Sequence, residues 1–140
     1  MFFVRINCIV QNYQETEYEY KRQYQDTNKI LQLELFQKIP VEIDGCTCYF
    51  YTSDNDRKEN MYILVSDFAL LAFVKINEQL LKFELQTYDG QNDVFSYAHK
   101  EMIMTIKIKK KLSNGLLIGN ITLYVEDRIV QQKFIAICEC

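Results

Sequence analysis

Apolar and polar side chains alternate along most of this chain with a period of two residues, which is the period of a β-strand. The clearest example is residues 69–76 followed by residues 80–87, two alternating segments separated by Asn77, Glu78 and Gln79. Such a pair predicts an antiparallel hairpin that turns at these three polar residues. The same alternation occurs at residues 3–11, 29–36, 46–52, 61–66, 102–109, 117–125 and 129–140.

Short polar segments join the predicted strands, among them Asp44 with Gly45, and residues 113–115. Residues 94–100 are weakly patterned and are predicted to be a connection. Residues 12–28 fit a short exposed helix or an edge strand, because their Tyr side chains follow both periods. We therefore predict an all-β fold: a single antiparallel β-barrel or sandwich of eight or nine strands, mostly a meander, with at most one short helix.

The composition is typical of one globular domain over residues 1–140, since 49% of the residues are apolar and 25% are charged. Ten Tyr and nine Phe strengthen the β prediction, because aromatic rings pack well on a pleated sheet. With only four Gly and one Pro, Asn and Asp must form most of the turns.

The charge and hydropathy argue against two classes of partner. A formal net charge of -3 makes a nucleic-acid partner unlikely, since proteins that bind phosphate backbones usually carry excess Lys and Arg. No apolar run reaches the roughly 18 residues of a membrane span, so we expect no transmembrane segment.

One candidate binding surface combines aromatic and basic side chains: Tyr18, Tyr20, Tyr24, Lys107 and Lys109. Tyr rings interleaved with basic residues are able to stack on nucleic-acid bases. Three glutamates in the same Tyr-rich stretch oppose a polyanion, so a solvated face is the favoured interpretation of the tyrosines. The lysines equally fit a strand whose outer face is kept soluble.

The residues needed for catalysis are scarce. His99 is the only histidine, and no partner motif accompanies it. No glycine-rich phosphate loop is present, and the acidic loop at residues 53–60 lacks the glycine and the terminal glutamate of a helical calcium motif. We expect a protein that is not an enzyme, with no catalytic residues, no metal and no cofactor.

Four of the five cysteines form two Cys-x-Cys pairs: Cys46 with Cys48, and Cys138 with Cys140. On a strand, each pair places both sulfur atoms on one face. If the two strands are neighbours with their sulfurs on a common face, cross-strand disulfides are able to form. A zinc site and four free thiols are the alternatives, and the zinc site is weaker because zinc-binding cysteines are usually two to four residues apart.

Residues 45–50, 72–77, 82–85 and 138–140 resemble landmarks of a functionally uncharacterised family of small exported or lipid-anchored bacterial β proteins with paired Cys-x-Cys motifs. The resemblance covers about residues 45 to 140. It implies an extracytoplasmic setting, at the periplasm or cell surface, and therefore paired cysteines. It implies no activity.

These observations together favour a non-enzymatic binding or protein-interaction module for an unknown protein or small ligand, with the Cys-x-Cys pairs as its framework. A small oligonucleotide-binding barrel is one alternative. An intracellular immunity or inhibitor protein is the other, and it would place the protein in the cytoplasm.

Overall fold

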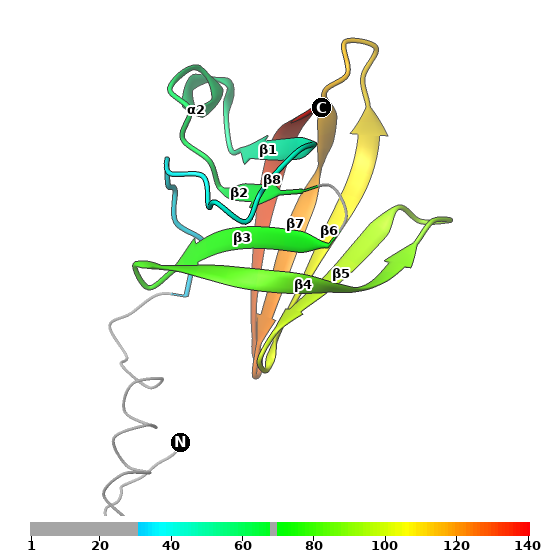
Figure 1. Ribbon diagram of the computed structural model, residues 1–140. Coiled ribbons are helices and arrows are strands. Elements are labelled where there is room, and N and C mark those ends of the chain that lie inside the picture. Colours follow the sequence, from blue (N-terminus) through cyan, green and yellow to red (C-terminus); the bar gives the residue numbers. More distant parts are fainter. Residues whose placement is uncertain (1–30, 68–69) are drawn as a thin grey trace, which may run out of the picture. The chain divides into compact units, whose positions relative to one another are not determined.

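A computed structural model describes residues 31–67 and 70–140, and in this part of the chain eight strands form one closed antiparallel barrel (Figure 1). The strands are β1 (Thr47–Tyr51), β2 (Leu64–Ser66), β3 (Leu71–Ile76), β4 (Gln79–Asp89), β5 (Val94–His99), β6 (Met102–Lys111), β7 (Leu117–Val125) and β8 (Arg128–Glu139). Each strand pairs with the next along the chain, and β8 pairs with β1 to close the barrel. The all-β fold predicted from the alternation is confirmed.

The predicted hairpin is present as β3 and β4. Its turn residues Asn77 and Glu78 both have positive φ, at 52° and 65°, which is typical of the tight turns whose twist matches that of the flanking strands. Gly45, at φ +86°, precedes β1, so the chain turns into that strand at the predicted position.

Two of the predictions within this region are wrong. Residues 94–99 are not a connection but strand β5, because a barrel that closes on itself hydrogen-bonds both edges of the segment, to β4 and β6, despite its weak pattern. Residues 31–36 do not continue a strand. They make single bridges at Glu34 with Lys75 and at Phe36 with Tyr62, because the pairing of β2 with β3 spans only two residues and leaves just a short edge of β3 free beyond it.

The acidic loop contains the helix of the described chain, α2 (Asp54–Lys58). Ser53 caps it by accepting a hydrogen bond from the Asp56 backbone N–H at 3.1 Å, and Asp54 pairs with Arg57 at 2.7 Å. The carboxylates therefore stabilise a helical turn. The strand predicted for residues 3–11, and the helix or strand predicted for residues 12–28, lie outside the described residues.

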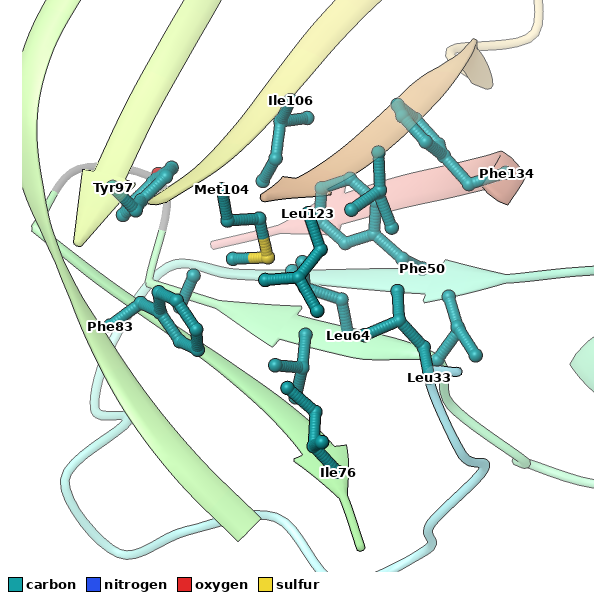
Figure 2. Close-up of a cluster of buried hydrophobic side chains, with 14 of the residues drawn as sticks. Leu33, Phe50, Leu64, Ile76, Phe83, Tyr97, Met104, Ile106, Leu123 and Phe134 are labelled. Carbon is teal, nitrogen blue, oxygen red and sulfur yellow. The ribbon is translucent and has the colours of Figure 1, made fainter. Parts of the chain in front are cut away.

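Apolar side chains fill much of the barrel interior, and Figure 2 shows them pointing inward from strands around its circumference. Those that are at most 2% exposed include Phe83, Tyr97, Met104, Leu123 and Phe134. Leu33 packs into the same cluster, together with Leu31 and Leu35. The alternation at residues 31–36 thus reflects burial against the barrel.

A second apolar cluster lies on the outer face of β1, where Tyr49 and Tyr51 alternate with the inward-facing Cys48 and Phe50. Tyr62 packs on both tyrosines, with ring centroids 5.4 and 5.7 Å away. Burial, with smaller effects from Tyr62 and Glu139, raises the pKa of Tyr51 to about 12. This layer covers the outside of the strand that closes the barrel.

Gly119 lies opposite Phe134, where a β-bulge between Ile108 and Lys110 interrupts the pairing of β6 with β7. A Cβ atom at Gly119 would lie 2.8 Å from the Phe134 ring and still closer to the carbonyl oxygen of Lys107. Only a residue without a side chain fits here.

We expect Gly119→Ala to lower the free energy of unfolding by about 2–3 kcal/mol, because an extra methyl group in a packed interior forces backbone and ring apart. Gly90→Ala is the matched control, since its Cβ would meet only the Tyr88 ring, at 3.3 Å. Guanidinium unfolding of both variants measures the difference, and equal losses would contradict this packing.

The pKa of Tyr51 generates a prediction about alkaline pH. Since the phenol loses its proton near pH 10 in the unfolded chain but only near pH 12 in the folded protein, the contribution of Tyr51 to stability should be constant below pH 10 and fall between pH 10 and 12. Tyr51→Phe should flatten this fall. Unfolding measured from pH 9 to 11.5 tests it, with Tyr124→Phe on the exposed outer face as the control.

Candidate functional site

The seam between β1 and β8 brings the two Cys-x-Cys pairs together. Five residue pairs make up its register, from Thr47 opposite Glu139 to Tyr51 opposite Ile135, and Cys48 lies directly opposite Cys138. The predicted neighbourhood of these strands, with their sulfurs on a common face, is confirmed.

Two disulfides cross this seam, Cys46–Cys140 and Cys48–Cys138, with Cα–Cα distances of 4.0 and 3.9 Å. Cys48 and Cys138 are partners in the strand register, and Cys46 and Cys140 lie one residue beyond its last pair, Thr47 with Glu139. Cys48 is buried in the barrel core, whereas Cys140 is exposed at the end of the chain. The two bonds therefore have different surroundings.

A cavity of about 260 Å³ opens beside the inner disulfide. The lining residues come from β1, β2 and β4 to β8 and from the turns at this end of the barrel. They are Cys48, Phe50, Ser66, Tyr88, Asp93, Phe95, Tyr97, Ile106, Ile108, Lys111, Gly115, Leu117 and Cys138. We call this cavity the mouth. The Cys48–Cys138 disulfide therefore joins two strands of its wall.

The inner part of the mouth is apolar. Tyr97 is 2% exposed, and its phenol hydrogen-bonds the side chain of Ser66. Burial raises the pKa of Tyr97, although this hydrogen bond opposes the shift, so the phenol stays neutral at ordinary pH. Since these two polar groups bond to each other, the inner surface presents mainly hydrocarbon and sulfur.

The rim carries the polar groups. Tyr88 stacks on Phe95, with ring centroids 4.4 Å apart, and its hydroxyl donates a hydrogen bond of 3.1 Å to Asp93. That hydrogen bond, more than the partial burial, raises the pKa of Tyr88. The Lys111 Nζ lies 3.9 Å from the other oxygen of Asp93. An apolar interior thus ends in an aromatic and charged edge.

Two β-bulges orient the side chains of this rim. The bulge between Leu85 and Thr87 places Tyr88 opposite Phe95, and that between Ile108 and Lys110 places Lys111 opposite Leu117. Phe95 and Leu117 both line the mouth. Each bulge adds a residue to one strand, which reverses the faces beyond it and turns Tyr88 and Lys111 inward.

His99 lies away from the mouth and has a packing contact. Its Nδ1 donates a hydrogen bond to the Lys82 carbonyl at 2.8 Å, and its ring packs 5.4 Å from that of Phe83. The cavity lining contains no histidine.

The two lysines of the predicted binding surface do not line the mouth. Lys107 and Lys109 lie exposed on β6, and the Lys107 Nζ donates a hydrogen bond of 3.4 Å to the carbonyl of Asn92. Tyr18, Tyr20 and Tyr24 lie outside the described residues, so this surface stays a prediction.

Sequence reasoning found the disulfide wall of the mouth but missed its aromatic and charged rim. Tyr88 and Asp93 lie between the predicted strand at residues 80–87 and the predicted connection at residues 94–100, and Lys111 follows the predicted strand at residues 102–109. The aromatic residues in the weakly patterned segment 94–100 were a signal for Phe95 and Tyr97, because such rings favour strands.

The disulfides generate a prediction about non-additivity. The bonds span 94 and 90 residues, and closing one loop of this length removes about 4–5 kcal/mol of unfolded-state entropy. The second bond then closes only a short ring and adds less, about 2 kcal/mol. We expect Cys46→Ser with Cys140→Ser to cost about 2 kcal/mol, and removal of all four cysteines to cost about 6 kcal/mol.

Guanidinium unfolding of the oxidised variants measures these losses, and alkylation without reductant checks the starting state, in which four of the five cysteines should be protected. If the losses of stability from removing each disulfide alone add up to the loss from removing both, the two bonds do not share one long loop in the unfolded chain.

Within residues 31–67 and 70–140, no helix is long and apolar enough to cross a membrane. The same residues bring together no group of three or more His, Cys, Asp and Glu side chains suited to a metal ion. No protein-family model, curated protein or solved structure matches the chain.

Proposed function

We propose that this protein is a non-enzymatic binding module that holds a small, largely apolar ligand in the mouth of its barrel. The observation that carries the proposal is the 260 Å³ cavity, whose wall contains the Cys48–Cys138 disulfide and the rings of Phe50, Phe95 and Tyr97. Apolar concavities with a few polar groups at the edge are the usual form of small-molecule sites, and barrel mouths are a common place for them.

The size of the barrel supports this proposal. An eight-stranded barrel is just wide enough for its own side chains to fill it or for one small ligand to enter. Here Phe83, Met104 and Leu123 belong to the packed core, whereas Ile108 and Leu117 line open space. One molecule of about nine non-hydrogen atoms matches that volume, at roughly 30 Å³ per atom.

The chemistry of the lining favours binding over catalysis. Its sulfur atoms are held in a disulfide, and its hydroxyl groups at Ser66 and Tyr97 bond to each other. The third hydroxyl, that of Tyr88, donates to Asp93, and its pKa is raised, whereas a nucleophile is activated by a lowered pKa or by a base that takes its proton.

The two disulfides support a location outside the cytoplasm, in the periplasm or at the cell surface. Disulfides persist in such oxidising compartments and are rare where glutathione and thioredoxin keep thiols reduced. Both bonds hold the seam that borders the mouth, so the oxidised protein is the form proposed to bind.

A protein partner is the second candidate. Ile103, Tyr124 and Ile129 are 42%, 38% and 62% exposed, and they are cross-strand neighbours on β6, β7 and β8. They lie at the opposite ends of these strands from the mouth residues Ile108, Leu117 and Cys138. An apolar row of this kind favours contact with another protein over contact with nucleic acid.

Filling the mouth tests the first proposal. We expect 1-naphthol, a neutral molecule of about 11 non-hydrogen atoms, to bind with a dissociation constant on the order of 100 µM, from about 0.5 kcal/mol per atom. Leu117→Trp should abolish binding because the indole occupies the cavity. Titration calorimetry with the full oxidised chain measures the dissociation constants of the unchanged protein and of this variant.

Ile118→Trp is the matched control, because Ile118 is the next residue along β7 and faces the outside of the barrel. It should leave the affinity unchanged, and circular dichroism shows that both variants fold. Binding that survives Leu117→Trp, or that both variants lose equally, would place the ligand elsewhere.

A further inference from the structure

The charges at the rim of the mouth are unequally satisfied. Asp93 uses both of its oxygens: one accepts the Tyr88 hydroxyl at 3.1 Å, and the other faces the Lys111 Nζ at 3.9 Å. Asp89 accepts hydrogen bonds from the Gln91 and Asn92 backbone N–H groups and, at 2.8 Å, from the Asn92 side chain. These acids therefore serve the turn that joins β4 to β5.

The lysines at this end of the barrel are less engaged. The Lys111 side chain is 70% exposed, and among the described residues its ion pair with Asp93 lies at the outer limit of such contacts. Lys110, the preceding residue, is exposed as well. The ammonium of Lys111 thus has donors to spare at a position that borders the cavity.

The inner surface cannot satisfy a polar ligand. Ser66 and Tyr97 are hydrogen-bonded to each other, and Phe50, Ile106 and the inner disulfide supply the rest of the deep lining. A polar group pushed inward would lose its water without gaining a partner. A ligand must therefore enter with its apolar part first and leave its polar part at the rim.

We infer that the mouth selects small amphiphilic carboxylic acids, with an apolar body of about nine atoms in the cavity and a carboxylate paired with the Lys111 ammonium. This inference rests on the proposed function and adds the chemical class of the ligand. A cationic amphiphile fits less well, because Asp93 is already occupied and Lys111 would repel it.

Three ligands with the same nine-carbon chain test this selection: nonanoate, nonan-1-ol and nonylamine, each titrated calorimetrically into the full oxidised chain at low ionic strength. We expect nonanoate to bind about fivefold more tightly than nonan-1-ol, because one exposed ion pair adds about that factor to an affinity. The amine should bind more weakly than the alcohol. Raising the salt concentration to 0.5 M should remove the advantage of nonanoate and leave the alcohol unaffected.

Lys111→Gln removes the charge while keeping a side chain of similar length. It should lower the affinity for nonanoate about fivefold and leave the affinity for nonan-1-ol unchanged. Lys133→Gln is the control, because Lys133 is exposed on the outer face of β8. This variant should bind both ligands with the affinity of the unchanged protein.

The outcomes separate the two proposals. If none of the three ligands binds, the mouth is not a ligand site and the proposed function fails. If all three bind with equal affinity, or if Lys111→Gln weakens the acid and the alcohol alike, the cavity stands as a site but the selection of carboxylates is refuted. Preferential binding of the amine would refute it as well.

Discussion

Closure of the barrel at the β1–β8 seam is the constraint on which the rest of the structure depends. A strand edge left unpaired exposes a row of backbone donors and acceptors, and only full closure removes both edges of a sheet. Here the closing pair joins the first and last strands of the barrel through five residue pairs, so it must gather segments about 90 residues apart. The two disulfides make that long-range pairing permanent, and the outer tyrosine cluster covers it.

The seam also determines where open space remains. Bulky side chains fill the interior toward β3 and β4, where Phe83 and Ile76 lie. Beside the seam, the inward positions at the mouth belong to the small side chains of Cys48 and Cys138. A disulfide is compact and cannot spread to fill a gap as a leucine would. The inner of the two disulfides therefore leaves the cavity beside it.

Much of this fold could be predicted from the sequence, because the alternation of side chains reports directly which face of a strand is buried. The β3–β4 hairpin and the pairing of the Cys-x-Cys strands followed from local pattern and symmetry. The segment at residues 31–36 did not, because its leucines are buried by packing and not by strand pairing. The rim was missed for a related reason: beyond each bulge the alternation is inverted, so simple counting places Tyr88 and Lys111 on the outer face.

The same two bulges determine how the rim would change if β4 or β6 lost a residue in the course of evolution. Loss of Lys109 or Lys110 would restore the regular alternation of β6, and Lys111 would then lie two residues after the inward-facing Ile108, still on the inner face. Because residues 109–111 are all lysine, loss of any one of them leaves a lysine at this inward position. The charge at the mouth is thus protected against a change of length in this strand. Loss of Gln86 or Thr87 would likewise leave Tyr88 on the inner face of β4, but its neighbours Thr87 and Asp89 carry no ring, so loss of Tyr88 itself would remove the aromatic group from the rim.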